Sequence, residues 1–158
     1  MRTTQTQQQV AAPTPPKVPA FANAIMRWVL RSPFSRICDT AVVLLTVTGR
    51  RTGRCFTFPV QYVEDGDTLW ITSGAGPEKT WWRNLVGGAP IDVELRRQAL
   101  HGTAEVVTYG EDPATVEEGI RRHVARFPKF AEKLGIDDPE VFAAHVRNSV
   151  IVRIHLAR

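Results

Sequence analysis

The chain has 158 residues, a formal net charge of +4, 43% apolar residues and 23% charged residues. This length suits one domain with a real core, and the near-average composition excludes bulk disorder. The chain has no apolar run long enough for a membrane span, and its two cysteines, Cys38 and Cys55, fit neither a metal motif nor a disulfide framework, so we expect a cytoplasmic protein.

The first residues differ in composition from the rest of the chain. Residues 1–19 are polar and then rich in Ala and Pro, without the apolar core of a signal peptide, so we expect a disordered leader followed by one domain over residues 20–158. Phe21–Leu30 has apolar residues at helical spacing, which predicts an amphipathic helix. We expect this helix to pack on the domain. Together with Arg31, its residues Arg27 and Trp28 also suit weak peripheral contact with an anionic surface at the inner face of a membrane, and that alternative stays open.

Short β-branched runs separated by tight turns predict an antiparallel sheet. The expected strands are Ala41–Thr48, Cys55–Val63, Thr68–Ser73, Ile91–Leu95, Gln98–Val107 and Ser149–Leu156. The Asp-Gly pair in Glu64–Asp67 indicates a hairpin turn, and Pro59 marks an edge, a bulge or a strand end. About six strands with short turns favour a closed or half-closed barrel over a parallel sheet.

Three helices are expected around these strands. Glu78–Val86 is predicted to form a short helix that ends at the following glycine pair. The pairs Asp112-Pro113 and Asp138-Pro139 place proline in a first helical turn, which predicts helices to about Arg126 and through His145. The expected fold class is therefore α+β, with an antiparallel barrel-like sheet and flanking helices.

The loop Gly49–Arg54 is the first candidate binding feature. It holds Arg50, Arg51 and Arg54 together with Thr52, Gly49 and Gly53. Guanidinium groups match phosphate and carboxylate oxygens in pairs, and glycine lets backbone N–H groups approach an anion closely. The loop therefore suits an anionic ligand. A solvated charged turn is an equally ordinary alternative.

The second candidate feature follows the third strand. The loop Ser73–Pro77 contains small residues and leads into the next helix, whose start suits an anion. Lys79 adds positive charge there, while Trp81 and Trp82 supply flat apolar surface. Adjacent helical residues cannot both face one site, so we expect one of the two tryptophans to be a core residue.

No acid–base constellation is recognisable in the chain. The four histidines, His101, His123, His145 and His155, fall on separate elements without a cysteine or serine partner, so we expect surface or structural roles for them. No metal-ligand spacing is present, and we expect no metal site. A bound cofactor would therefore have to supply any redox chemistry.

With these two loops in view, the chain resembles the deazaflavin-dependent nitroreductase and quinone reductase family of actinobacteria. The resemblance rests on Thr48–Gly53, Pro59, Ser73-Gly74 and the series Lys79, Trp81, Asn84-Leu85 and Pro90. Those proteins are split β-barrels, similar to flavin reductases, that use the reduced deazaflavin coenzyme F420. The resemblance implies an antiparallel split β-barrel with flanking helices for this chain.

The resemblance also implies roles for residues. Arg51 would face the phosphorylated tail of the cofactor, Ser73 would lie beside the deazaflavin ring, and Trp81 would line the ring pocket. The implied cofactor-binding set is Arg50, Arg51, Thr52, Gly53, Arg54, Pro59, Ser73, Gly74, Lys79, Trp81 and Asn84. We expect Ser73 to be the catalytic residue, because its hydroxyl can stabilise negative charge that develops on the acceptor.

The chain departs from the family at several positions. Phe56 stands where the family often has a second basic residue, for which Arg54 can substitute, and Gly74 stands where lysine is frequent. Phe127 and Phe130 keep the aromatic character of the family's substrate-pocket tyrosines without their hydroxyls. We expect Trp28, Phe127 and Phe130 to wall the substrate pocket.

The expected function is hydride transfer from the reduced coenzyme to a small-molecule quinone, nitroaromatic or activated alkene. One alternative keeps the fold and uses flavin mononucleotide. Another is a non-catalytic binder of haem or a fatty acid, with His101 as the candidate axial ligand. Nucleic acid is not an expected partner, because the basic residues do not form a long patch interleaved with aromatics. The sequence carries no signal for an oligomeric state.

Overall fold

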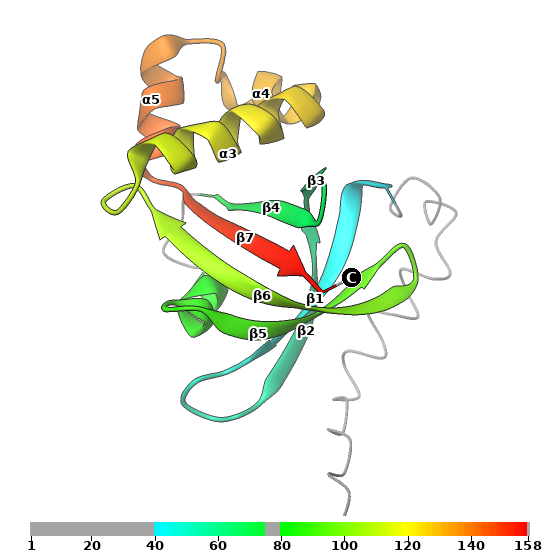
Figure 1. Cartoon of the computed structure of the whole chain (residues 1–158). Coiled ribbons are helices and arrows are strands. Elements are labelled where there is room, and N and C mark those ends of the chain that lie inside the picture. The colour runs from blue at the N-terminus through cyan, green and yellow to red at the C-terminus, as the bar shows by residue number, and fades with distance from the viewer. Residues whose placement is uncertain (1–39, 75–79, 158) are drawn as a thin grey trace, which may run out of the picture.

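The computed structural model describes residues 40–74 and 80–157, which form one curled antiparallel sheet, and the helices within residues 113–147 gather at one end of it (Figure 1). The strand order is β2-β1-β5-β6-β7-β4-β3. The strands are β1 (Val42–Thr48), β2 (Cys55–Gln61), β3 (Val63–Asp65), β4 (Thr68–Ser73), β5 (Ala89–Leu95), β6 (Gln98–Thr108) and β7 (Val150–Leu156). The curl makes a half-barrel, so the expected α+β fold with an antiparallel split barrel is confirmed.

A sharp corner in the chain explains why the sheet curls. Tyr62 is the single residue between β2 and β3, although these strands occupy opposite ends of the strand order. One residue spans less than about 4 Å, so the two edges must meet at this point. Tyr62 is buried there, and its amide donates to the Ala41 carbonyl at 3.3 Å. The corner therefore holds one end of the opening between β2 and β4.

Two groups of buried side chains hold the fold together. The larger group fills the inside of the curl, with residues from β1, β4, β5, β6 and β7. The smaller group joins the sheet to the helices and includes Val116 and Ile120 of α3 (Pro113–Arg126) and Ile151 of β7. Burial of apolar surface at about 25 cal/mol per Å² makes these two groups the main stabilising contribution.

Helix α3 approaches the sheet very closely at one glycine. A Cβ atom on Gly119 would lie 2.5 Å from Cδ1 of the buried Ile151, so only glycine allows this contact without a shift. His123 follows one helical turn later and lies on the same face of α3. The close approach at Gly119 thus carries His123 toward the sheet.

Two helices begin at the Asp-Pro pairs where the sequence predicts them. Asp112 caps α3 through a hydrogen bond from the Thr115 amide at 3.0 Å. Asp138 caps α5 (Pro139–Arg147) in the same way, accepting from the Glu140 amide at 2.8 Å.

In the described residues no helix is both long and apolar enough to cross a bilayer.

The structure differs from the sequence prediction in three places. The expected strand Cys55–Val63 is broken by the Tyr62 corner, which adds β3 and makes seven strands instead of about six. The expected helix Glu78–Val86 is described only from Thr80 and forms a short 3₁₀ helix, η1 (Trp81–Leu85). Helix α4 (Pro128–Leu134) was not expected. The predicted leader and the predicted helix Phe21–Leu30 lie outside the described residues.

Candidate functional site

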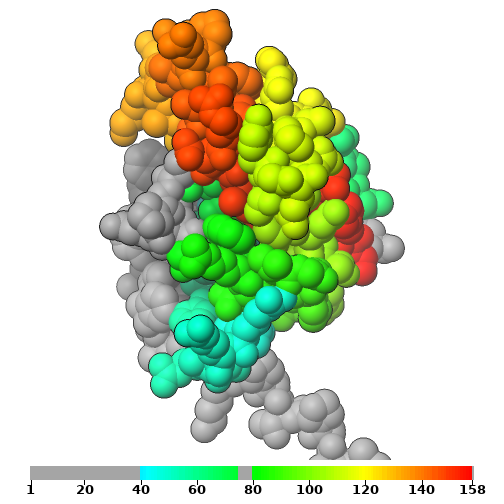
Figure 2. Space-filling view, turned by 90° about the vertical axis from the view of Figure 1, so that its left-hand side faces the viewer, coloured from blue at the N-terminus to red at the C-terminus, as the bar shows by residue number. Residues whose placement is uncertain are grey.

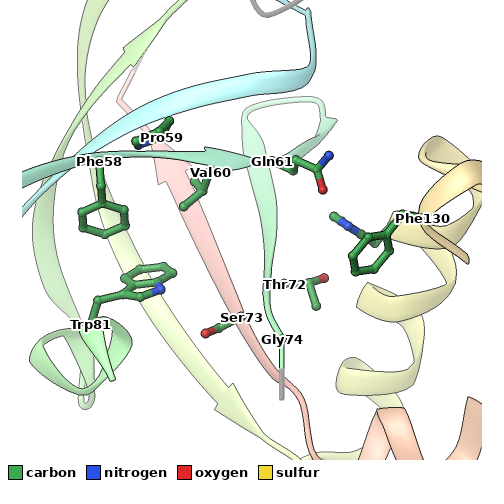
Figure 3. Close-up of a pocket in the computed structure, with 10 residues that line it drawn as sticks. Phe58, Pro59, Val60, Gln61, Thr72, Ser73, Gly74, Trp81 and Phe130 are labelled. Carbon is green, nitrogen blue, oxygen red and sulfur yellow. The ribbon is translucent and has the colours of Figure 1, made fainter. Parts of the chain in front are cut away.

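The pocket at the opening of the half-barrel is the candidate site. It lies where β2 and β4 face each other, beside η1 and the helices (Figure 3), and encloses about 350 Å³. Its lining residues are Phe58, Pro59, Val60, Gln61, Thr72, Ser73, Gly74, Trp81, His123 and Phe130. Four of the predicted cofactor residues are therefore together in this pocket, namely Pro59, Ser73, Gly74 and Trp81.

The pocket has two halves with different chemistry. We call the side with Phe58, Val60, Ser73 and Trp81 the inner half and the side with Gln61, Thr72, His123 and Phe130 the outer half. In Figure 3 the Ser73 hydroxyl points toward Trp81, whereas Thr72 points toward Phe130. This division follows from the alternation of side chains along β4, which sends neighbouring residues to opposite faces.

The inner half presents flat aromatic surface and one unpaired hydroxyl. The rings of Phe58 and Trp81 meet edge to face, with centroids 5.1 Å apart. Ser73 is 4% exposed, and its Oγ has no hydrogen-bond partner within the part of the chain that the structure describes. A buried hydroxyl without a partner costs about 1–3 kcal/mol, so a ligand that pairs with it gains affinity.

The outer half contains a buried histidine, His123, for which the sequence predicts a surface or structural role. His123 is 4% exposed and packs against Phe127 and Phe130, with ring centroids 4.8 Å and 5.2 Å away. Burial lowers the pKa of His123 to about 4, and repulsion from His145 adds to this shift. Burial also lowers the pKa of His145. The imidazole of His123 is therefore neutral at pH 7. Phe130 lines the pocket, whereas Phe127 contacts the His123 ring behind it.

The basic loop is tied to the pocket through Asn84. The Arg50 amide donates to Oδ1 of Asn84 at 3.0 Å, and Nδ2 of Asn84 donates to the Trp81 carbonyl at 3.1 Å. The Arg50 guanidinium donates to the Val86 carbonyl. Arg50 and Asn84 thus connect the β1–β2 loop to η1 and hold Trp81 at the pocket wall.

The other two arginines of the loop point into solvent. Arg51 and Arg54 are exposed, and neither forms an ion pair with a described residue. Gly53 takes the left-handed conformation with φ +66°, and the Arg54 amide donates to Oγ1 of Thr52 at 3.3 Å. Figure 2 shows this hairpin at one end of the molecule, with α4 and α5 at the other. The loop therefore presents two exposed cations that have no ion-pair partner in the described part of the chain.

Some expected residues lie elsewhere. Trp28 and Lys79 lie outside the described residues. His101 is exposed on β6, where its Nδ1 lies 2.6 Å from Oδ1 of Asp92, and it does not line the pocket, so the suggestion of an axial haem ligand there is wrong. No cluster of three or more His, Cys, Asp or Glu residues suited to a metal occurs over residues 40–74 and 80–157.

A comparison with models of known protein families shows which family this chain belongs to. Residues 32–138 match the model of the F420H(2)-dependent quinone reductase family. The chain belongs to this family. It is accordingly an oxidoreductase, and its cofactor is the deazaflavin F420, as the sequence resemblance implied.

Solved structures show the same fold as this F420-dependent reductase. An F420-H2 dependent reductase, FDR-A, is 16% identical with a TM-score of 0.52, over 72% of this chain and 93% of that chain. The flavocytochrome Anf3 from Azotobacter vinelandii is also 16% identical, with a TM-score of 0.50, over 77% of this chain and 61% of that chain. At these identities the likeness concerns the fold alone.

The residues present fit a deazaflavin cofactor. The inner half offers an apolar aromatic wall for a planar ring and the unpaired Ser73 hydroxyl for one of its polar atoms. Arg54 precedes Phe58 by four residues, or about 13 Å along a strand, so its cation can meet a phosphate on a tail that leaves the pocket. A cavity of about 350 Å³ suits ring systems but not the whole cofactor, which agrees with a tail outside it.

Proposed function

We propose that this chain uses reduced F420 to convert a small quinone into a hydroquinone in the cytoplasm. When bound, the reduced deazaflavin supplies a hydride and releases one proton, and the quinone gains one hydride and one proton overall. The observation that carries this proposal is the buried, unpaired Ser73 hydroxyl in a pocket walled by Trp81 and Phe58. A planar ring against aromatic side chains, with one polar atom at its edge, suits this arrangement.

The chain's own residues then have separate tasks. Trp81 and Phe58 position the ring, Pro59 and Gly74 shape the walls beside it, and Ser73 donates a hydrogen bond where negative charge develops. Arg51, Arg54 and Lys79, with the backbone of Thr52 and Gly53, bind the phosphorylated tail. The proton reaches the product from solvent, because none of the described pocket residues is an acid at pH 7.

The outer half of the pocket sets the choice of acceptor. Phe130 provides an apolar wall without a hydroxyl, with Phe127 behind it and Trp28 as a further proposed wall. A flat quinone suits these surfaces. A bicyclic nitro compound would find no tyrosine hydroxyl there, so we expect quinones to be the better acceptors, by an amount set by one neutral hydrogen bond of about 0.5–1.5 kcal/mol.

The test is stopped-flow oxidation of reduced F420 with menadione and with a bicyclic nitro compound, compared with the rates without protein. Parallel absorbance titrations with F420, flavin mononucleotide and haem measure cofactor preference. We expect binding of F420 and faster reduction of menadione. If F420 binds but no acceptor is reduced faster than without protein, the chain is a carrier and the proposal is wrong.

Ser73→Ala separates the proposed donor from the rest of the site. We expect about a 3- to 10-fold fall in the rate of menadione reduction, because one neutral hydrogen bond is lost. Thr68→Ala is the matched control, since Thr68 also lies on β4 and loses a hydroxyl but does not line the pocket. The proposed role of Ser73 fails if both variants lose the same activity.

A further inference from the structure

His123 is a buried polar residue whose Nδ1 has no hydrogen-bond partner among residues 40–74 and 80–157. It is 4% exposed, it lines the outer half of the pocket, and its Nδ1 has no hydrogen bond to any described residue. Buried polar atoms in native proteins nearly always have partners. An unpaired nitrogen at a pocket wall therefore points to a partner that arrives with a ligand.

The surroundings hold the His123 ring in place. Phe127 and Phe130 pack on the ring with centroids 4.8 Å and 5.2 Å away. The contact of Gly119 with Ile151 sets the distance of α3 from the sheet one turn earlier. A ring held by two aromatic neighbours loses little further freedom on binding, which favours a directed hydrogen bond.

The protonation state of His123 limits what it can do. Burial lowers its pKa to about 4, with His145 of α5 as a second cause, so the imidazole is neutral at pH 7 and is no proton donor in the acid–base sense. A neutral imidazole has one N–H donor and one acceptor nitrogen. Its N–H can polarise a carbonyl group and stabilise an oxyanion that develops on it.

We propose that His123 is a specificity-determining residue that donates a hydrogen bond to the carbonyl oxygen of the quinone in the outer half of the pocket. This proposal rests on the proposed function. It assigns the two halves of the pocket to two ligands, with Ser73 and Trp81 on the cofactor side and His123 and Phe130 on the acceptor side. Gln61 is exposed and Thr72 is half-buried, so His123 is the donor best shielded from water among these residues.

Two substitutions test the hydrogen bond. His123→Phe keeps an aromatic ring and removes both nitrogens, and we expect kcat/KM for menadione to fall about 3- to 10-fold. His123→Asn retains an N–H donor, and we expect it to recover most of this loss. The Kd for F420, measured without an acceptor, should stay unchanged in both variants, because His123 lies in the other half of the pocket.

Nitrogen-15 NMR of histidine-labelled wild-type protein gives a readout independent of turnover. Menadione added to the protein without coenzyme should move the His123 imidazole signal and leave the signal of the exposed His101 unmoved. An unmoved His123 signal overturns the proposed hydrogen bond. So does an unchanged kcat/KM in a folded His123→Phe variant that reduces menadione. In either case the proposed quinone reduction stands. If wild-type protein reduces no quinone, the proposed function fails, and the NMR signal alone then decides whether His123 binds quinones.

Discussion

At the scale of single residues, three arginines of one loop have different environments although they are close in sequence. The Arg50 guanidinium donates to the Val86 carbonyl, and its amide donates to Asn84. Arg51 and Arg54 are exposed and form no ion pair with a described residue. The fold thus uses Arg50 to fix the loop and leaves the other two guanidiniums available for an anion.

The double variant Arg51→Ala, Arg54→Ala should weaken F420 binding by about ten-fold or more per lost contact, because charge-assisted hydrogen bonds are worth about 1.5–3 kcal/mol each. The affinity of the wild-type protein should fall with added salt, and that of the variant should respond less. Fluorescence titration of F420 measures both effects. Arg147→Ala, at the exposed end of α5, is the matched control. Equal affinity of the double variant and the control would remove the loop from the site.

His123 should make the stability of the fold depend on pH. Its pKa is about 4 in the folded protein and near 6.5 in the unfolded chain, so between these values the unfolded chain binds the proton and the folded protein does not. The contribution of His123 to the free energy of unfolding is therefore fully present above about pH 6.5 and decreases as the pH falls toward 4. Urea unfolding at pH 7.5 and pH 5 should show a loss of about 2 kcal/mol from this group. His123→Phe should show a smaller loss; an identical loss in both proteins would exclude this histidine as the cause.

Sequence reasoning could find some of these residues and not others. Ser73 and Trp81 belong to a recognisable series of motifs, and both line the pocket. His123 has no partner nearby in sequence, and its burial depends on how closely α3 packs on β7. The available signal was Gly119, a glycine inside a predicted helix, which suggests a close packing contact on the face that also carries His123.

At the scale of secondary structure, the helix signals were reliable where a cap and a proline coincide. Asp112-Pro113 and Asp138-Pro139 begin α3 and α5 as expected. Helix α4 has similar signals, with Pro128 in its first turn and Gly135 left-handed at its end, but its seven residues are too short for a clear apolar period. The strand Cys55–Val63 reads as continuous because alternation passes through Tyr62, and only tertiary packing bends it there.

Gly119→Ala tests the packing of α3 against the sheet. Alanine gains about 1 kcal/mol of helix propensity, whereas its Cβ would meet the buried Ile151 side chain and cost about 1–3 kcal/mol. We expect a net loss of about 1 kcal/mol in the free energy of unfolding, measured with urea. Gly110→Ala is the control, because its added Cβ would meet nothing within 4 Å. A stabilised Gly119→Ala variant would show that Ile151 moves aside without cost.

At the scale of the whole molecule, the order of the strands could not be read from local patterns. β1 pairs with β2 through a short hairpin, as expected, but its other neighbour is β5, which lies far along the chain. β7 is inserted between β6 and β4 after the helices. Such pairings depend on which apolar faces can be buried together, so the barrel class was predictable from short strands and turns while the strand order was not.

The Tyr62 corner makes one short stretch of the gene responsible for both walls of the pocket. Residues 58–74 contribute seven of the ten lining residues, although β2 and β4 are far apart in the strand order. Mutation or recombination confined to this stretch can therefore remodel both sides of the site at once. β5, β6 and β7, which lie outside this stretch, would keep their sequences unchanged. Evolution or engineering can therefore alter the two strand walls through this one stretch, while the proposed acceptor contacts of His123 and Phe130 are encoded outside it.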